Sequence, residues 1–348
     1  MEPISAKGMD SHLLLKYLKS YYSHRNSLQI SDFKDITSGW ETEIFSFDLE
    51  WISDKGKENE KLIVRVYAPG TGEKAERESM VMKKLSEVGY PVPSIHLTEI
   101  DDSMLGHPFM IMERINGKTL EDIISMPGVD RSNWINLFSR LFVDLHNLDW
   151  THFIFDSQII PKDDPYFIIN TTLAYFKDVI DRYGKSELDP ILDWLKARVD
   201  RVPCKKPSIT HGDFHPMNIL IDGSGNPFVI DWGASKVRDF RSDLAWTLVL
   251  TRAYSTRENR DVILNGYQRA VEHPIDEIEY FEVIAILRRL LDVSISMDEG
   301  AISRGMRETA VELMKEQMGH IRVVYNLLGE LTEIQIPKIE EWIESFIH

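Results

Sequence analysis

The sequence predicts an α+β protein built as two lobes, the first rich in strands and the second in helices. Between Asp32 and Tyr67, apolar residues alternate with polar ones, which is the two-residue period of strands with one buried face. Beyond Gly117 they recur every three or four residues, as on packed helices. A chain of 348 residues, 43% of them hydrophobic, is long enough to bury a core in each lobe. We therefore expect three parts: an N-terminal helical extension (1–30), a sheet with one helix (31–115) and a helical lobe (116–348).

Composition limits the classes of partner. Lysine and arginine number 40 and aspartate and glutamate 56, so the formal net charge of −16 argues against non-specific binding to nucleic acid. No run approaches the ~18 apolar residues of a membrane span, and the start Met-Glu-Pro lacks the apolar core of a signal peptide. The single cysteine, Cys204, cannot form an intramolecular disulfide. We expect no nucleic-acid or membrane partner and a cytoplasmic location.

The first lobe is expected to begin with a helix at 10–22, capped by Asp10 or Ser11, and to continue as antiparallel strands. One strand is indicated by the alternating apolar residues Phe45, Phe47, Leu49 and Trp51. It leads through a turn to the apolar run 62–67. Ser38–Glu41 lies between the first two expected strands. With its single glycine, this segment is either a loop that covers a bound phosphate or an ordinary hairpin turn.

Arg65 is a cation inside the apolar run 62–67, so it needs an acidic partner if it is buried. In the helix expected at 73–88, Glu78 shares a face with Val81. An ion pair between strand and helix either positions the phosphates of a nucleotide or is purely structural. We favour the first interpretation because of the polar residues found further along the chain.

Two more apolar runs, 94–98 and 108–112, complete a sheet of about five strands. The chain then leaves the sheet through Met112-Glu113-Arg114-Ile115. In a two-lobed nucleotide-binding enzyme this exit is the hinge, whose backbone groups face the adenine. Glu113 and Ile115 are therefore candidate nucleotide-binding residues.

Apolar residues at helical intervals predict helices in the second lobe, including 134–148, 191–202 and 280–291. His146 borders the first of these apolar stripes, and a structural histidine is the simpler explanation for it. Acidic residues near the last helix either face a substrate or are solvated; they are Asp292, Asp298 and Glu299. Because solvation is the simpler explanation, none of them is assigned to a site.

Thr210–Gly233 carries the densest group of candidate catalytic side chains. Asp213 and Asn218 are five positions apart, the spacing of a kinase catalytic loop, in which the acid accepts a hydroxyl proton and the amide oxygen binds magnesium. Asp231 follows 13 positions later, and short apolar runs flank the turn 222–226 between them. Antiparallel pairing of these runs would bring Asn218 and Asp231 together. Two protein ligands suffice for Mg²⁺, because it keeps water and phosphate oxygens as its other ligands.

The segment His211-Gly212-Asp213-Phe214-His215 also alternates imidazole and carboxylate groups, as in a dinuclear metallohydrolase. Such sites need further ligands from later clusters, whereas His273, His320 and His348 are isolated in the sequence. A metal-dependent phosphohydrolase is therefore the less favoured alternative.

Together these motifs resemble the aminoglycoside phosphotransferase and choline kinase family of protein-kinase-like enzymes. The most specific part is the combination of HGDFHPMN with IDWG. Weaker motifs support it by their order along the chain; they are Ile63-Val64-Arg65, Arg77-Glu78, Val92-Pro93, Met112-Glu113, Leu145-His146 and Ser242-Asp243-Leu244-Ala245. The resemblance extends from about Asp32 to beyond Leu291.

The resemblance implies a two-lobed protein-kinase-like fold and Mg²⁺-dependent transfer of the γ-phosphoryl group of ATP or GTP to a small hydroxylated acceptor. Suitable acceptors would be an aminoglycoside, a choline-like amine, a macrolide or a sugar. Asp213 would be the catalytic base, and Asn218 and Asp231 would bind Mg²⁺. Arg65, paired with Glu78, would contact the phosphates.

The resemblance also implies that His211 and Asp243 brace the catalytic loop, and it leaves the role of His215 open. Two departures from the family pattern concern loops: Ser38–Glu41 lacks multiple glycines, and Arg238–Ser242 replaces a frequent Gly-Asp-Pro. A kinase-like protein that binds nucleotide without turnover is a further alternative. A protein kinase is disfavoured, because no Ala-Pro-Glu follows Asp231.

Overall fold

The computed structural model describes residues 9–37, 42–155, 160–161, 163–299, 310–316 and 318–347. Two compact units make up this part of the chain. The first contains the described residues up to Lys118 together with Leu220–Gly233, and the second contains the others. Ser38–Glu41, expected to be a phosphate-covering loop or a hairpin turn, and His348 lie outside the described residues.

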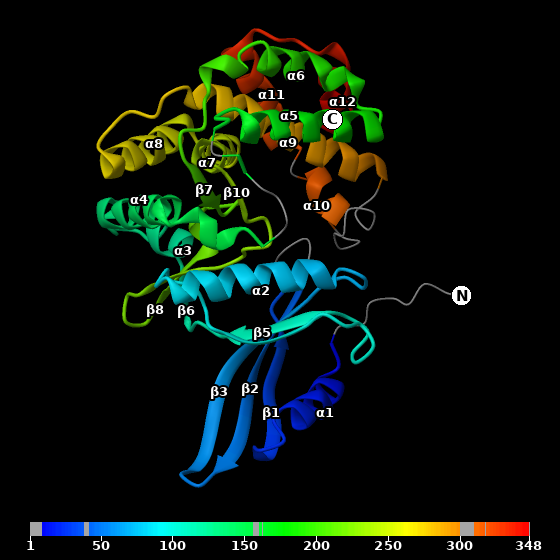
Figure 1. Cartoon of the computed structure of the whole chain (residues 1–348), viewed down its shortest axis with the longest axis vertical. Helices are drawn as coiled ribbons and strands as arrows, with labels where there is room; N and C mark the ends of the chain where they lie inside the picture. Colours follow the sequence, from blue (N-terminus) through cyan, green and yellow to red (C-terminus); the bar gives the residue numbers. More distant parts are fainter. Residues whose placement is uncertain are drawn as a thin grey trace. The chain divides into compact units, whose positions relative to one another are not determined.

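The first unit is built on five antiparallel strands in the order β1-β2-β3-β5-β4 (Figure 1). The strands are β1 (Asn26–Asp35), β2 (Glu43–Ser53), β3 (Gly56–Val66), β4 (Ile95–Glu99) and β5 (Phe109–Glu113). The predicted sheet of about five strands is therefore confirmed. β1 begins before the expected start of the sheet at residue 31, because Leu28 is buried against Leu14 and Leu18 of the first helix.

Two helices accompany this sheet, α1 (Ser11–Tyr21) and α2 (Gly72–Glu87). The side chain of Asp10 accepts a hydrogen bond from the backbone N–H of His12 and caps α1, which satisfies a donor that the first turn leaves unpaired. α2 lies against β4 and β5 (Figure 1). Its inward face buries apolar side chains and also Glu78, which is 2% exposed. A charged group at that depth requires a partner.

The second unit is mainly helical. Its helices are α3 (Leu120–Ile124), α4 (Arg131–Asn147), α5 (Phe167–Arg182), α6 (Asp189–Lys196), α7 (Phe240–Tyr254), α8 (Arg257–Val271), α9 (Ile278–Glu299), α10 (Ala310–Glu316), α11 (Gly319–Thr332) and α12 (Pro337–Ile347). Short 3₁₀ turns lie between them at η1 (Trp150–Phe153), η2 (Ser186–Leu188), η3 (Val199–Arg201) and η4 (Pro216–Asn218). The predicted combination of an antiparallel sheet followed by a mainly helical part is confirmed.

The expected helix at 191–202 is shorter than the pattern indicated. α6 ends at Lys196, and the separate turn η3 follows. Pro203 accounts only for the exclusion of Val202 from a helix, because the residue directly before a proline is disfavoured in helical conformation. In contrast, α9 extends beyond the expected 280–291, and α4 covers most of the expected 134–148.

Two small sheets hold the stretch Thr210–Gly233. β7 (Pro207–Thr210) pairs antiparallel with β10 (Lys236–Asp239), and β8 (Ile219–Asp222) lies between β6 (Gly117–Thr119) and β9 (Pro227–Val229). A Cβ atom at Gly117 would lie 2.1 Å from the carbonyl oxygen of Ile221, so this strand contact requires glycine. The candidate catalytic loop therefore connects β7 to β8, and Asp231 follows β9.

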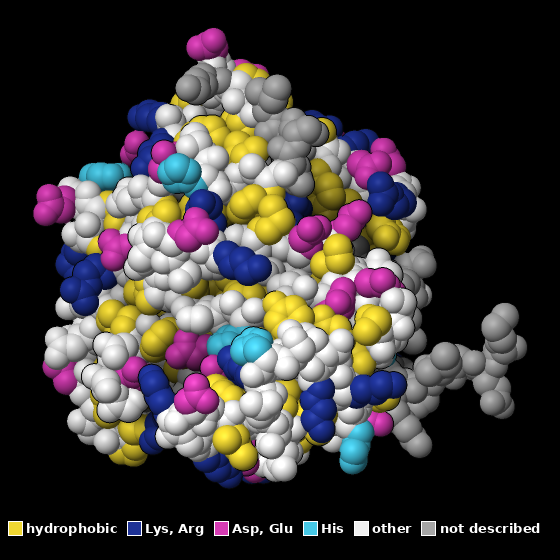
Figure 2. Space-filling view, turned by 60° about the horizontal axis from the view of Figure 1, so that its bottom comes forward, with side chains coloured by type: hydrophobic (Ala, Val, Ile, Leu, Met, Phe, Trp, Pro, Cys, Tyr) yellow, Lys and Arg dark blue, Asp and Glu magenta, His cyan; other side chains and the backbone are white. Residues whose placement is uncertain are grey.

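The surface is mixed in character on the face that Figure 2 shows, where acidic, basic and hydrophobic side chains are interspersed. The net charge of −16 is thus not gathered into one patch on that face. Among the helices that the structure describes, none combines the length and the apolar composition needed to cross a membrane.

Candidate active site

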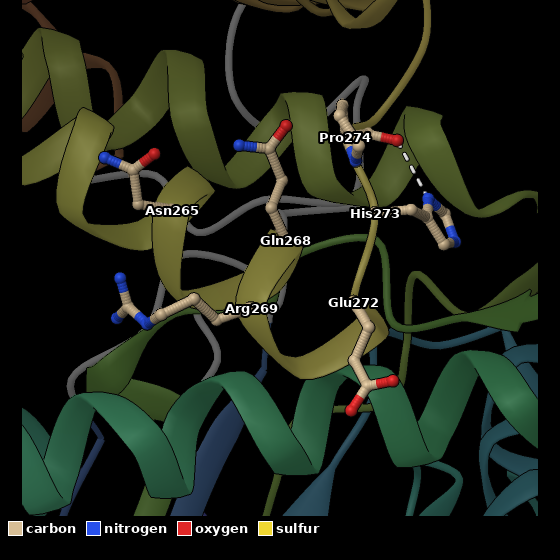
Figure 3. Close-up of a pocket in the computed structure, with 6 residues that line it drawn as sticks. All are labelled: Asn265, Gln268, Arg269, Glu272, His273 and Pro274. Atoms are coloured by element: carbon tan, nitrogen blue, oxygen red, sulfur yellow. Dashed lines mark hydrogen bonds between the residues drawn. The ribbon is translucent and has the colours of Figure 1, made fainter.

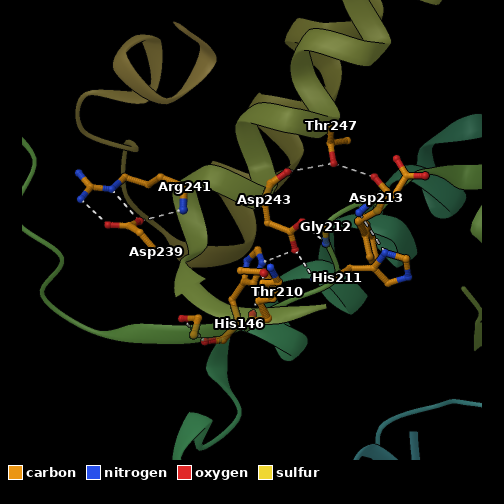
Figure 4. Close-up of polar contacts among 12 residues, drawn as sticks. His146, Thr210, His211, Gly212, Asp213, Asp239, Arg241, Asp243 and Thr247 are labelled. Carbon is orange, nitrogen blue, oxygen red and sulfur yellow. Dashed lines mark hydrogen bonds and ion pairs between the residues drawn. The ribbon is translucent and has the colours of Figure 1, made fainter. Parts of the chain in front are cut away.

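The carboxylate of Asp243 holds the loop between β7 and β8. This side chain is buried in the first turn of α7, and it accepts hydrogen bonds from the backbone N–H groups of His211 and Gly212, both at 2.7 Å (Figure 4). Its Oδ2 also lies 3.2 Å from Nε2 of His146. Burial raises the pKa of Asp243, but its contacts with His146 and His211 outweigh this effect, and the net pKa is below the usual value. The bracing role expected for Asp243 is confirmed by these contacts.

The two histidines next to Asp243 are structural. His146 is buried, and its Nδ1 lies 2.8 Å from the hydroxyl of Tyr267, so both ring nitrogens have partners. This agrees with the structural role expected for His146. His211 is fully buried, and its Nδ1 accepts a hydrogen bond from the backbone N–H of Asp213 at 3.2 Å.

Gly212 is required by the course of the loop. Its φ of +85° lies in the left-handed region, and a Cβ atom there would lie 2.6 Å from the carbonyl oxygen of Ala234. The backbone conformation and the close approach of Ala234 therefore require glycine at the middle position of His-Gly-Asp.

Asp213 presents a carboxylate that is oriented from both sides. Its Oδ1 accepts a hydrogen bond from Nε1 of Trp246 at 2.9 Å, and its Oδ2 lies 3.4 Å from Nε2 of His215. Burial raises the pKa of Asp213, but these two contacts outweigh it and hold the pKa well below the usual value. The side chain is still 37% exposed. Asp213 is thus an ionised acceptor that a substrate group can reach.

Asn218 ends the loop with its amide nitrogen turned inward. Nδ2 donates to the carbonyl oxygen of Asp213 at 3.0 Å and lies 3.1 Å from Nε2 of His215. Nδ2 of Asn218 thus bonds within the loop. Its Oδ1, on the other side of the same amide group, can bind a ligand that prefers oxygen. His215 contacts both Asp213 and Asn218, and this is the role that the sequence left open.

The first unit contains a separate charged cluster around Arg65. Its Nη1 lies 3.0 Å from Oε1 of Glu78, and its Nη2 donates to Oδ1 of Asp231 at 2.8 Å. The predicted ion pair between β3 and α2 is therefore present. The hydroxyl of Tyr67 donates to Oε2 of Glu78 at 2.8 Å. Burial lowers the pKa of Arg65, but Glu78 and Asp231 outweigh it, so the pKa is raised and the guanidinium remains charged.

Asp231 has a backbone conformation that few residues adopt. Its φ is +69°, in the left-handed region where aspartate is tolerated better than most side chains. This conformation directs the chain out of β9, while the carboxylate reaches Arg65 and stays 45% exposed. The placement suits a carboxylate that serves a ligand as well as an internal partner.

The strand exit after β5 is more constrained than the sequence indicated. The backbone N–H of Glu113 donates to the carbonyl oxygen of Ser94 at 2.9 Å, and that of Arg114 donates to Lys61 at 3.0 Å. The Glu113 carboxylate also accepts a hydrogen bond from the backbone N–H of Ser94. These bonds occupy the backbone N–H groups of Glu113 and Arg114, and the nucleotide-binding roles of Glu113 and Ile115 stay predictions.

Sequence reasoning missed two side chains beside the catalytic loop, Trp246 and Arg288. The guanidinium carbon of Arg288 lies 3.7 Å from the ring centre of Trp246, and Nη1 donates to the carbonyl oxygen of Gly212 at 3.1 Å. A signal for Trp246 was its position three residues after Asp243, on the same helical face. Arg288 was visible as a cation inside an apolar helix, the same kind of signal that identified Arg65.

Two of the acids considered as substrate contacts lie near cations. Oδ2 of Asp292 lies 3.6 Å from Nε of Arg288, and Asp298 forms an ion pair with Lys185. The side chain of Glu299 lies outside the described part of the structure. A neighbouring cation therefore offsets the negative charge of each of these two acids.

Three similar solved structures are a kinase and two proteins described as aminoglycoside phosphotransferases. A Ralstonia eutropha protein assigned as an aminoglycoside phosphotransferase matches with a TM-score of 0.60 and 16% identity, covering 92% of this chain and 99% of that one. Aminoglycoside phosphotransferase APH(4)-Ia, in ternary complex with AMP-PNP and hygromycin B, matches with a TM-score of 0.59 and 16% identity over 89% and 97%. Plasmodium vivax ethanolamine kinase gives 0.56 and 14% over 86% and 81%. These similarities establish the fold, which is protein-kinase-like.

The family follows from the sequence match. Residues 33–281, well over half of the chain, match the phosphotransferase enzyme family (APH), and the protein belongs to that family. The predicted membership in a family of phosphotransferases is thereby confirmed.

Curated relatives are longer proteins. Mouse (Mus musculus) acyl-CoA dehydrogenase family member 10 is 25% identical over 182 residues, which cover 49% of this chain and 16% of the relative. Rat (Rattus norvegicus) member 11 is 27% identical over 208 residues, covering 54% and 25%. The chain thus matches a quarter or less of the length of these two relatives.

Proposed function

We propose that this phosphotransferase is a small-molecule kinase that transfers the γ-phosphoryl group of ATP or GTP to a hydroxyl group of a small acceptor. The observation that carries the proposal is the state of Asp213, an ionised and partly exposed carboxylate fixed between Trp246 and His215. We assign nucleotide binding to residues 31–115 and acceptor binding to residues 116–348. Phosphoryl transfer needs mainly positioning and charge neutralisation, and such a carboxylate supplies the first.

Asp213 is the proposed catalytic base. Its depressed pKa makes it a weak base, so it orients the acceptor hydroxyl by accepting a hydrogen bond and takes the proton late, as the new P–O bond forms. The contacts of Trp246 and His215 keep the carboxylate from rotating. The bonds from Asp243 to the loop hold its backbone in place.

Magnesium is the proposed cofactor, with Asn218 and Asp231 as its protein ligands. These residues flank the β8–β9 segment, and both offer an oxygen: the amide of Asn218 turns its nitrogen inward, and the Asp231 carboxylate is partly exposed. The donor set fits a hard cation that prefers oxygen. When bound, Mg²⁺ would neutralise charge on the nucleotide phosphates. Arg65 would add a second positive charge for those phosphates, positioned by Glu78.

Similar structures support the choice of ligands. APH(4)-Ia was crystallised with AMP-PNP and hygromycin B, and another similar structure is an ethanolamine kinase. A nucleotide donor and a small hydroxylated acceptor are therefore the ligands we propose for this chain. Among the described residues, no three His, Cys, Asp or Glu side chains are grouped to hold a metal ion, so the metallohydrolase alternative gains no support.

The test is production of nucleoside diphosphate in the presence of small hydroxylated acceptors, with ATP and with GTP, before and after removal of Mg²⁺ by EDTA. Asp213→Asn should lower kcat by about 10²- to 10⁴-fold, because it removes the proton acceptor. Asp178→Asn is the matched control, since Asp178 forms an exposed ion pair with Arg182 on α5. Undiminished turnover by Asp213→Asn would exclude Asp213 as the base. Nucleotide binding without turnover of any acceptor would favour the binding-only alternative.

A further inference from the structure

Arg288 lies on α9 beside the catalytic loop, and two contacts fix its guanidinium plane. It lies over the indole of Trp246 at 3.7 Å, and its Nη1 donates to the carbonyl oxygen of Gly212, the residue that precedes Asp213. Trp246 also donates a hydrogen bond to the Asp213 carboxylate, so the same indole contacts both Arg288 and the proposed catalytic base. Arg288 is thus linked to Asp213 through Trp246 and through the backbone of Gly212.

The guanidinium of Arg288 keeps donors for a further ligand. Arginine has five N–H donors in a planar fork. Within the described residues, its hydrogen bond to Gly212 uses one of them, and its nearest acid, Asp292, is 3.6 Å from Nε, a distance beyond a good hydrogen bond. The side chain is 28% exposed, so solvent or a small molecule can reach it.

A second guanidinium lies in the next position of α9. Arg289 donates to the hydroxyl of Tyr254 at 2.6 Å, and its Nε donates to Nε2 of His320 at 3.1 Å. Tyr254 is half exposed. Burial raises the pKa of Tyr254 above its usual value, although the neighbouring charge of Arg289 opposes this shift. Arg289 therefore adds a buried positive charge to α9 where this helix contacts Tyr254 of α7 and His320 of α11.

We propose that the acceptor carries an acidic group, a carboxylate or a phosphate, which Arg288 binds while the acceptor hydroxyl faces Asp213. The inference rests on the proposed kinase function and names the acceptor class for the same site. A planar guanidinium held on an indole is preorganised for two parallel hydrogen bonds to an oxyanion. An amine acceptor would instead bring a second cation against Arg288, and like charges in a partly dehydrated site repel.

The experiment compares acceptors that share a sugar skeleton and differ in charge: gluconate, glucose 6-phosphate, glucose and glucosamine, with choline and hygromycin B as further amines. kcat and KM are measured for the wild type, Arg288→Gln and Arg288→Lys. Gluconate and glucose 6-phosphate distinguish a carboxylate from a phosphate as the bound group. Arg198→Gln is the matched control, because Arg198 also lies over a tryptophan, Trp194 at 4.2 Å, and donates to its carbonyl oxygen.

We expect the wild type to prefer at least one acidic acceptor over glucose and glucosamine. Arg288→Gln should raise KM for that acceptor by about 10- to 100-fold, the loss expected for a hydrogen bond to a charged group, and should change turnover of neutral acceptors much less. Arg288→Lys should recover part of the affinity, because it keeps the charge and loses the fork. Arg198→Gln should leave both KM and kcat unchanged.

Several outcomes overturn the inference. If the wild type prefers amines, or if Arg288→Gln lowers kcat equally for all acceptors, Arg288 only positions Gly212 and Trp246. The preference of the wild type decides the question by itself if Arg288→Gln does not fold. No turnover of any acceptor, acidic or not, would refute the proposed kinase function and with it the inference.

Discussion

Replacing Asp243 by asparagine tests whether one buried carboxylate holds the catalytic loop. Asp243 accepts two backbone hydrogen bonds of 2.7 Å and contacts His146, and its side chain is fully buried. The amide of asparagine can accept one of these backbone bonds, but its NH₂ group then faces the other N–H donor. An unsatisfied buried donor and a lost charge together should lower the free energy of unfolding by about 3–5 kcal/mol.

The pH dependence of this loss has a defined sign. Because the pKa of Asp243 is lower in the folded protein than in the unfolded chain, its contribution is fully present above the unfolded value, near pH ~4. It is lost as the pH falls through the lower folded pKa. The difference in stability between wild type and Asp243→Asn should therefore be complete at pH 7 and should shrink below about pH 4.

The assay is urea denaturation followed by circular dichroism at several pH values, together with kcat for an identified acceptor. Glu282→Gln is the matched control: Glu282 is 2% exposed, and its side chain accepts two hydrogen bonds from Arg260 of α8, a helix outside the loop. Both variants should lose stability, but only Asp243→Asn should also lose kcat. A loss of stability below ~1 kcal/mol, or an unchanged kcat, would refute the reasoning.

Three further predictions concern the site. Arg65→Lys keeps the positive charge but loses the planar guanidinium that contacts both Glu78 and Asp231, so KM for the nucleotide should rise by about tenfold. An unchanged KM would show that Arg65 does not contact phosphates. Trp246→Phe removes the N–H group that donates a hydrogen bond to Asp213, so the pKa of Asp213 should rise and kcat should fall by about 10-fold. The measurement is the pH–rate profile, and an unchanged profile would contradict the prediction. Gly212→Ala should unfold at a lower temperature, because its Cβ would collide with Ala234, and an equal Tm would show that the loop adapts.

The sequence predicted the elements whose signals are local. The period of two between Asp32 and Tyr67 and the apolar runs 94–98 and 108–112 predicted the five-stranded sheet. The helical period predicted α2, α4 and α9, because this pattern repeats within one element. Boundaries were less predictable. β1 starts at Asn26 because Leu28 packs on α1, and that contact cannot be read from the alternation of neighbouring residues.

The ion pair of Arg65 with Glu78 was predictable because each residue is a charge within an apolar pattern of its own element. The contact of Arg65 with Asp231 was not, since 166 positions separate the two residues. The same applies to Trp246 and Asp213, which are 33 positions apart and meet only because α7 packs beside the loop. Contacts between residues so far apart in the sequence produce no local periodic pattern, so the sequence does not reveal them.

The sequence by itself therefore predicted the family of the protein and singled out Asp213, Asn218 and Asp231 as candidate site residues, because the spacing of these residues follows the course of one short loop and hairpin. Tertiary structure alone decided the environment of that set. It placed Trp246 on the carboxylate of Asp213, and it placed Arg288 over the indole. The position of Arg288 beside the loop depends on the packing of α9 against α7, two helices distant in sequence, so it became visible only in the folded chain.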